Sequence, residues 1–419
     1  MPDWLRPLLT RRMLVCVFTG FSSGLPLYLL LNLLPAWLRS DGVDLKIIGF
    51  FALIQFPYTW KFLWAPVLDR YRLPLGRRRG WMVISQIGLL LAIGLLGGFS
   101  PAADLTPVIW LAVALAFLSA TQDVALDAFR REILRDHELG LGNAVHVNAY
   151  RIAGLVPGSL SLILADLMPW GQVFWITAAF MLPGMAMVLL VDEPAAIGAP
   201  KTLRAAVVEP FHEFIGRKGW LGALLVLGFI FLYKLGDSLA TSLSTPFYLD
   251  LGYSMTDIGV IAKHAGLWPA VFGGLLGGLW MLRLGINRAL WLFGVVQMAT
   301  ILGFAWLASR GVQPSIDVVD RLALAGVIGA EYLGVGLGTA AFTAFIARAT
   351  NPAFTATQFA LFTSLAAVPR TFVNATAGAL VESLGWVHFF FLCFMLAAPG
   401  MLLLFRVAPW NETPALPKS

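Results

Sequence analysis

Apolar runs long enough to cross a bilayer recur along almost the whole chain, and they constrain its fold more than any other feature. A transmembrane helix needs about 20 mostly apolar residues, and such runs alternate here with short segments that carry charged or turn-forming residues. We therefore expect an all-α membrane protein with no sizeable soluble domain. The sequence predicts twelve transmembrane helices, at about 13–38, 46–68, 81–99, 107–130, 143–168, 172–191, 220–247, 256–281, 289–308, 318–347, 353–381 and 386–408.

The composition agrees with an integral membrane protein. Hydrophobic residues make up 59% of the chain and charged residues 12%, and the mean hydropathy is +0.80, which is far from the usage of soluble domains. Cys16 and Cys393 both lie in apolar runs, so we expect no disulfide framework, no metal site and no cofactor. The run at 13–38 is too long for a signal peptide and lacks a small-residue cleavage site, so we expect it to remain as a span.

Basic residues are distributed unequally between the two sides of the predicted membrane domain. With the N-terminus inside, twenty of the 29 Lys and Arg residues fall in inside segments, whereas the outside loops hold three, Arg39, Arg310 and Arg321. Cytoplasmic segments of membrane proteins carry the excess of Lys and Arg. The sequence therefore predicts an even number of spans and two cytoplasmic termini.

The longest predicted inside loop divides the chain into halves of six spans each. This loop, 192–219, carries three prolines and charges of both signs. We therefore expect two six-helix bundles, at 1–191 and 220–419, joined by 192–219 as a cytoplasmic linker. A shift of 209 residues also superimposes the basic loops after the second span of each half. It places Leu75, Gly76 and Arg79 on Leu284, Gly285 and Arg288.

Such a duplication is typical of transporters built from parallel repeats. In these proteins the substrate site lies between the two halves, near the middle of the bilayer. Ionisable residues inside the spans are then the first candidates for function, because a charge in hydrocarbon is costly and usually faces a cavity.

The first group of such residues lies in the N-terminal half. Asp123 and Asp127 are four residues apart and share a helix face next to Gln122. The second and fifth predicted spans add Lys61 and Arg151. All four charges lie at comparable depth, so two acids and two bases can pair to near neutrality.

A second group lies in the C-terminal half. Lys234 and Asp237 are three residues apart and therefore neighbours on one helix surface. Other predicted spans add Lys263, Glu331 and Arg370, which leaves an excess of one positive charge. A central cavity with this bias suits a substrate that carries carboxylates.

The buried carboxylates are the expected proton carriers. When a carboxylate becomes protonated, its paired cation is released and can hold an acid group of the substrate. The alternative is that these residues form structural ion pairs between helices, and it applies most strongly to Asp127 with Arg130. The candidates for proton coupling are Asp123, Asp127, Asp237 and Glu331.

Longer sequence motifs carry information that the spacing of single charged residues does not. The loop D-R-Y-R-L-P-L-G-R-R-R-G at 69–80 resembles the acidic-basic loop of the major facilitator superfamily. Five further stretches, from both halves, are G-F-S-S-G-L-P-L at 20–27, K-F-L-W-A-P-V-L-D-R at 61–70, A-T-Q-D-V-A-L-D-A-F at 120–129, L-Y-K-L-G-D-S-L-A at 232–240 and A-T-Q-F-A-L-F-T-S-L-A-A-V-P-R at 356–370. Together they resemble the anhydromuropeptide permease family of that superfamily.

This resemblance implies a fold and a transport activity. It implies the major facilitator fold and proton-coupled import of N-acetylglucosaminyl-anhydro-N-acetylmuramic acid, with or without stem peptide, across the bacterial inner membrane for peptidoglycan recycling. We expect a monomer that works by alternating access in the lipid bilayer, with no cofactor beyond the proton gradient and no nucleic-acid partner. The residues expected to bind the substrate are Lys61, Gln122, Arg151, Lys234, Lys263, Gln358, Arg370, Tyr28 and Trp268.

Three alternatives follow from the same residues. A permease for another anionic organic solute, such as a siderophore complex, could use the same scaffold. A membrane enzyme would need a catalytic cluster in a loop, and these loops are too short and too poor in nucleophiles to supply one. A sensor would need a soluble output domain, for which the predicted spans leave no room.

Overall fold

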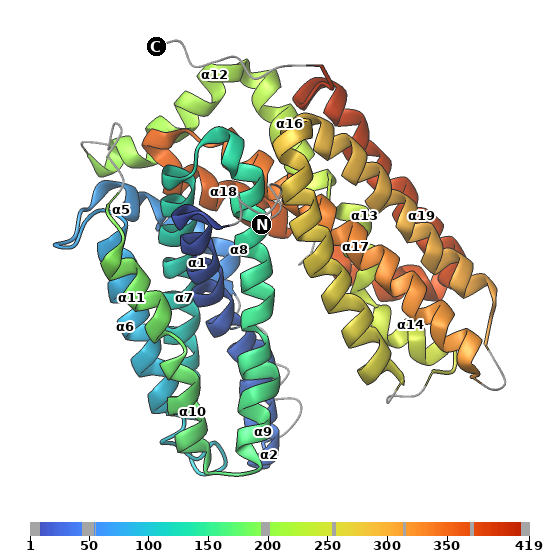
Figure 1. Ribbon diagram of the computed structural model, residues 1–419, viewed down its shortest axis with the longest axis horizontal. Helices are drawn as coiled ribbons and strands as arrows, with labels where there is room; N and C mark the ends of the chain where they lie inside the picture. Colours follow the sequence, from blue (N-terminus) through green and yellow to red (C-terminus); the bar gives the residue numbers. More distant parts are fainter. Residues whose placement is uncertain are drawn as a thin grey trace. The chain divides into compact units, whose positions relative to one another are not determined.

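The computed structural model describes residues 9–43, 54, 56–193, 202–253, 257–312, 316–368 and 373–411. The regular elements in these ranges are helices, apart from one isolated bridge between Leu73 and Gly76 (Figure 1). The prediction of an all-α protein is therefore confirmed. The expected second span, at 46–68, lies partly outside the described residues.

The helices of the N-terminal half follow the predicted apolar runs closely. The first span bends through a π-helical turn, Leu29–Leu33, between α1 and α2. The helices are α1 (Arg11–Tyr28), α2 (Leu34–Ser40), α4 (Phe56–Trp60), α5 (Ala65–Arg70), α6 (Arg79–Leu96), α7 (Thr106–Ile133), α8 (Leu139–Ala153), α9 (Ser161–Ala165), α10 (Trp170–Ala179) and α11 (Leu182–Leu190).

Several helices of the C-terminal half are longer than a single span. They are α12 (Leu203–Leu232), α13 (Leu235–Ser242), α14 (Ser244–Asp250), α16 (Lys263–Ser309), α17 (Val318–Ala349), α18 (Thr355–Val368) and α19 (Ala377–Val407). Three of them contain one glycine each at which φ is positive: Gly219 (70°), Gly285 (73°) and Gly385 (73°). Glycine alone adopts this conformation at no steric cost, so these positions turn the chain where the linker and two inter-span loops were predicted.

The described helices agree with twelve spans. Nine of them, within the residues the structure describes, are long and apolar enough to cross a membrane. One of these, Val260–Ser309, contains two predicted spans. The shorter helices α4 and α5 cover the described part of the second span, and α18 covers the first part of the eleventh.

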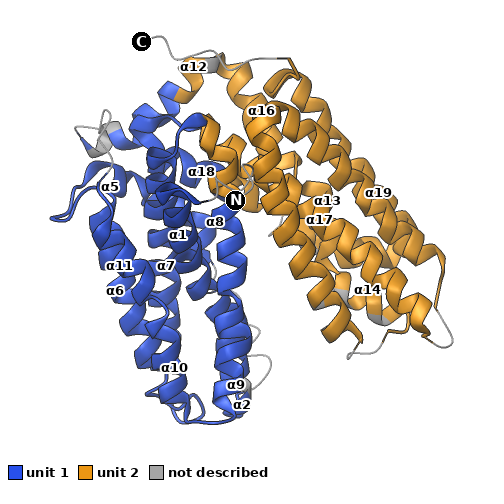
Figure 2. Cartoon of the chain, in the orientation of Figure 1, with its two compact units in different colours: residues 1–136, 145–213, 350–364 blue, residues 137–144, 214–349, 365–419 orange. Residues whose placement is uncertain are grey.

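Two compact units make up the chain (Figure 2). Each unit takes in a short segment from the other half of the sequence, Thr350–Ser364 in the first and His137–Ala144 in the second. Unit 1 consists of Met1–Asp136, Val145–Glu213 and Thr350–Ser364, and unit 2 of His137–Ala144, Phe214–Ala349 and Leu365–Ser419.

The arginines at the start of the predicted third span of each half both donate to backbone carbonyls near the end of that half. In unit 1, Arg79 donates hydrogen bonds to the carbonyl oxygens of Val188 (2.9 Å) and Leu189 (2.8 Å), near the end of α11. In unit 2, Arg288 donates to the carbonyl of Trp410 (3.5 Å), just past the end of α19. Helix ends leave carbonyls without partners, so Arg79 satisfies the end of α11, whereas Arg288 contacts the segment that follows α19.

Within each unit, neighbouring helices approach one another at glycines, as small residues allow in membrane proteins. A Cβ atom at Gly20 or Gly24 in α1 would overlap a backbone carbonyl of α8. In unit 2, a Cβ at Gly336 of α17 would overlap the carbonyl oxygen of Ala270 in α16. The neighbouring atoms are backbone, so they cannot move aside as a flexible side chain would.

Gly336→Ala is therefore expected to lower the free energy of unfolding by about 1–3 kcal/mol. The matched control is Gly326→Ala in the same helix, where a Cβ would meet no atom within 4 Å. This control should leave stability unchanged or raise it by up to about 1 kcal/mol. Denaturant unfolding of the purified protein in detergent measures both, and equal stability of the two variants would contradict the proposed close contact.

Candidate functional site

A buried ion-pair cluster lies in unit 1, around the carboxylate of Asp127. The Lys61 ammonium is 3.6 Å from Asp127 Oδ2, and the Arg130 guanidinium is 2.8 Å from Oδ1. Lys61 lies in a short 3-10 turn between α4 and α5 and is only 7% exposed. The structure therefore brings Lys61 and Asp127 together, as the residue pattern suggested.

Asp123, one turn away on α7, has a different partner. Ser23 of α1 donates a hydrogen bond of 2.6 Å from its hydroxyl to Asp123 Oδ1. Four residues earlier, Thr19 Oγ1 lies 3.1 Å from His146 Nδ1 of α8. The Thr19 hydroxyl also lies 3.1 Å from the carbonyl oxygen of Cys16.

The sequence analysis did not identify Ser23, Thr19 or His146. The available signal was the run of small polar residues in an apolar helix, because Thr19 and Ser23 are four apart and so lie on one face. Their partners on α7 and α8 are about a hundred residues away along the chain, and no local pattern indicates such a pairing.

The other predicted site residues of unit 1 that the structure describes lie on the same three helices, α1, α7 and α8. Gln122 is fully buried, and its Nε2 donates to the carbonyl of Ser22 at 2.7 Å. The ring of Tyr28 lies 5.5 Å from that of Tyr150, centroid to centroid. Arg151, half-buried, follows Tyr150 near the end of α8.

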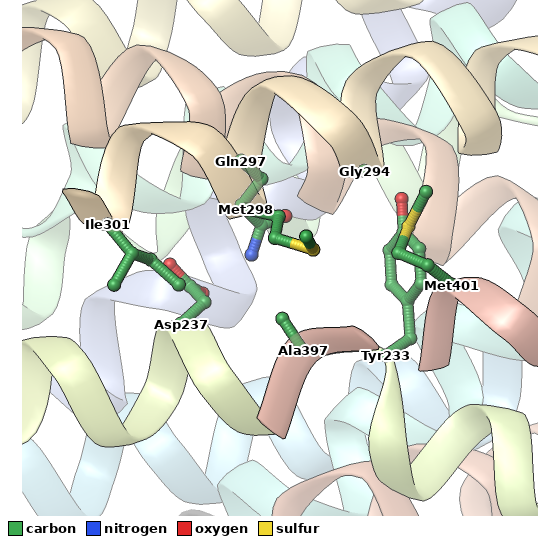
Figure 3. Close-up of a pocket in the computed structure, with 8 residues that line it drawn as sticks. All are labelled: Tyr233, Asp237, Gly294, Gln297, Met298, Ile301, Ala397 and Met401. Atoms are coloured by element: carbon green, nitrogen blue, oxygen red, sulfur yellow. The ribbon is translucent and has the colours of Figure 1, made fainter. Parts of the chain in front are cut away.

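A second buried cluster lies in unit 2. The Lys234 ammonium is 2.9 Å from Asp237 Oδ2. Asp237 also lines a small cavity between α13, α16 and α19. The volume of this cavity is about 10 Å³. Figure 3 shows Asp237 and Gln297 projecting toward this cavity from different helices. The volume suffices for about one water molecule.

Glu331 of α17 belongs to the same cluster. It is completely buried, and the side chains that act on its carboxyl group include Asp237, Thr300 and Lys234. Neither of its oxygens accepts a hydrogen bond from any residue that the structure describes.

The remaining predicted site residues lie elsewhere or are not described. Trp268 of α16 is 46% exposed. Gln358 of α18 donates from Nε2 to Glu213 Oε2 (2.8 Å) and to the carbonyl of Pro210 (2.9 Å), so its amide contacts the predicted linker. The side chain of Lys263 and all of Arg370 lie outside the described residues.

Asp69, which opens the predicted acidic-basic loop, is the centre of a polar network in unit 1. Its carboxylate accepts hydrogen bonds from Arg78 (2.7 Å) and from the backbone NH (2.8 Å) and hydroxyl (2.7 Å) of Thr357. Thr357 lies in the first turn of α18. There a carboxylate accepts hydrogen bonds from free NH groups, and its negative charge interacts favourably with the helix dipole. Asp69 therefore caps this helix.

Arg78 joins this network to a second carboxylate. Its guanidinium contacts Glu132 at 2.7 Å as well as Asp69, and the side chain is completely buried. Burial by itself lowers the pKa of Arg78, but Glu132 and Asp69 outweigh this effect and raise the pKa above its ordinary value. Arg78 therefore keeps its positive charge at any physiological pH.

The two clusters contain acids, bases and amides in spanning helices, and this chemistry suits the binding of polar solutes and protons. Among the described residues, no group of three or more His, Cys, Asp or Glu side chains could hold a metal ion. The clusters therefore resemble the binding and coupling residues of a transporter.

Comparisons with known proteins agree with this geometry. Residues 16–371 match the model of the Major Facilitator Superfamily. The chain is 41% identical over 408 residues to the anhydromuropeptide permease of Escherichia coli strain K12, covering 96% of this chain and 81% of that protein. It is 52% identical over 408 residues to an uncharacterized protein of Haemophilus influenzae, covering 96% of both.

A solved structure shows the same fold in a distant relative. The crystal structure of the human organic anion transporter MFSD10 (TETRAN) superimposes with a TM-score of 0.72 at 15% identity, covering 96% of this chain and 100% of that one. Family model and relatives cover nearly the whole length of the chain. This protein therefore belongs to the anhydromuropeptide permease family of the major facilitator superfamily, and it is a multi-pass membrane transporter rather than an enzyme.

Proposed function

We propose that this protein imports anhydromuropeptides into the cytoplasm by proton symport, for peptidoglycan recycling. The observation that carries the proposal is the 41% identity, over 96% of the chain, to a protein named anhydromuropeptide permease. We further propose that it acts as a monomer in the bacterial inner membrane with both termini in the cytoplasm, driven by the proton gradient without a cofactor.

The chemistry of the two clusters is compatible with such a substrate. An anhydromuropeptide carries sugar hydroxyls, acetamide groups and, with a stem peptide, carboxylates. Buried amides such as Gln122 can exchange hydrogen bonds with the acetamides, and the rings of Tyr28 and Tyr150 can stack on sugar faces. Lys61 and Lys234 supply the positive charges that carboxylates require.

Alternating access requires contacts that form in one state and break in another. The cap that Asp69 places on α18 is suited to this role, because it consists of hydrogen bonds to the first turn of a helix. We propose that these bonds open and re-form during the transport cycle.

The test is uptake by the purified protein in proteoliposomes. Labelled anhydromuropeptides, with and without stem peptide, should accumulate when an inward pH gradient is imposed and should only equilibrate when a protonophore dissipates it. Equal uptake with and without the gradient would leave transport intact but contradict proton coupling.

The second candidate function is import of another anionic organic solute, such as a siderophore complex. Lys61 and Lys234 can each pair with an acid group of either solute, so they do not distinguish between these substrates. The same proteoliposomes should take up labelled siderophore complex poorly. Robust siderophore uptake without muropeptide transport would reverse the assignment.

A further inference from the structure

The buried cluster of unit 2 contains more negative than positive groups among the residues that the structure describes. Asp237 and Glu331 are both acids, and Lys234 is the cation that contacts Asp237 and acts through its charge on Glu331. With both acids ionised, one negative charge would remain among the described side chains of this buried cluster. Such a charge is strongly unfavourable unless a cation or a proton neutralises it.

The buried hydrogen-bonding groups of the cluster also indicate that a proton is needed beside the two acids. Asp237 Oδ1, Gln297 Oε1 and both oxygens of Glu331 are buried acceptors with no donor among the described residues. Gln297 is only 4% exposed and lines the small cavity beside Asp237 (Figure 3). An ionised carboxylate can only accept hydrogen bonds, whereas a protonated one can also donate. A single proton on Glu331 therefore adds a second donor to this cluster, beside the Lys234 ammonium, which also has no hydrogen-bond partner among the described residues.

Two glycines bring Glu331 to this position. Gly334 and Gly338 follow Glu331 by three and seven residues, so all three lie on one face of α17. A Cβ at Gly338 would overlap Gln297 Oε1, and one at Gly334 would lie 3.1 Å from Gln297 Cα. The face that carries Glu331 therefore packs directly against the segment of α16 that carries Gln297.

The carboxylates of Asp123 and Asp127 in unit 1 each have a hydrogen-bond or ion-pair partner among the described residues. Asp127 contacts two cations, Lys61 and Arg130, and Asp123 accepts a short hydrogen bond from Ser23. Each of these two carboxylates therefore has a contacting donor or cation, whereas no such contact is found for the Glu331 oxygens among the described residues.

From this contrast we propose that Glu331 is the residue that carries the coupled proton, and that Lys234 and Asp237 position it. The inference rests on the proton symport proposed above and assigns its proton to one side chain. A proton from the proton-rich side binds a Glu331 oxygen, and the resulting O–H donates toward Asp237 Oδ1 or Gln297 Oε1. Release of that proton on the other side leaves both acids ionised, with Lys234 as their shared cation.

Other titratable groups also face Glu331. The side chains of Tyr248 on α14 and Cys393 on α19 are close enough to interact with its charge. Tyr233 lies near Asp237 but donates its hydroxyl proton to the carbonyl of Leu290, which leaves it no proton for Glu331. Neither tyrosine nor cysteine ordinarily releases a proton near neutral pH. The groups that can exchange the proton are therefore the carboxyl groups of Asp237 and Glu331.

Glu331→Gln tests the proposal in two independent ways. Infrared spectra of the wild type at neutral pH should contain the band of a protonated carboxyl group, and the variant should lack it. In proteoliposomes the variant should keep counterflow of anhydromuropeptide at no less than about a third of the wild-type rate, but accumulate none under a pH gradient. The control is Glu382→Gln, an exposed acid on α19, which should keep both the band and accumulation.

The other possible outcomes separate the proton-carrier proposal from the proposed muropeptide transport. If E331Q still accumulates substrate under a pH gradient or keeps the carboxyl band, Glu331 does not carry the proton. If a sodium gradient drives uptake in place of the pH gradient, the ion of this site is sodium and the proton assignment is wrong. If the wild type transports no muropeptide while E331Q loses the band, the substrate proposal fails and the protonated Glu331 stands. Should E331Q not fold, Asp237→Asn must shift the same band.

Discussion

Arg78→Ala is expected to lower the free energy of unfolding by about 3–5 kcal/mol, because it leaves two buried carboxylates without their shared cation. Arg78 is completely buried and lies 2.7 Å from both Asp69 and Glu132. Thermal and denaturant unfolding in detergent should show the loss directly.

Two further variants separate the charge network from general damage to the loop. Arg72→Ala removes a basic residue from the same loop whose side chain is exposed, and it should change stability by no more than about 0.5 kcal/mol. Arg78→Ala combined with Asp69→Asn and Glu132→Gln should recover part of the loss, because the stranded charges are gone. If Arg78→Ala were as stable as Arg72→Ala, the network would contribute nothing to the fold.

Lys61→Met is expected to reduce uptake of anhydromuropeptide by about 10–100-fold, the effect of losing one charge-assisted hydrogen bond to the substrate. Methionine keeps the apolar stem and removes the ammonium that lies 3.6 Å from Asp127. Folding should be largely preserved, since Asp127 retains Arg130 at 2.8 Å. Uptake by proteoliposomes and the melting temperature of the same preparation measure the two effects separately.

The double variant Lys61→Met/Asp127→Asn distinguishes substrate binding from a structural ion pair. If Lys61 only neutralises Asp127, removing both charges should restore uptake to near the wild-type rate. If Lys61 binds the substrate, the double variant should stay as impaired as the single one, and this is the result we expect. Arg72→Met, in the exposed part of the loop, serves as the control for loss of one positive charge.

Features that depend on neighbouring residues could be predicted from the sequence. The apolar runs predicted the helices because a segment in hydrocarbon must satisfy its backbone internally. The turns at Gly285 and Gly385 were predicted because they lie in short breaks between such runs, and both have positive φ. The Lys234–Asp237 pair follows from a spacing of three residues on a helix, and the structure gives it 2.9 Å.

Contacts between distant segments could not be predicted in this way. Ser23 meets Asp123, and Thr19 meets His146, across about a hundred residues or more. Gln358 was expected to bind substrate, and that prediction is still untested, but its amide contacts Pro210 and Glu213 through a fold that no local pattern specifies. Each of these pairings joins segments that only helix packing brings together.

By itself, then, the sequence determined which segments span the membrane, where the chain turns between them and which buried residues carry charge, since each depends on local composition and periodicity. The tertiary structure decided how those charges are balanced. Asp127 is neutralised because α4, α5 and α7 bring Lys61 and Arg130 to it. The glycines of α17 instead place Glu331 against the segment of α16 that carries Gln297, an amide without charge, and the Glu331 oxygens accept no hydrogen bond from the described residues. A charge balance depends on distances between helices, and those distances exist only after the helices have packed.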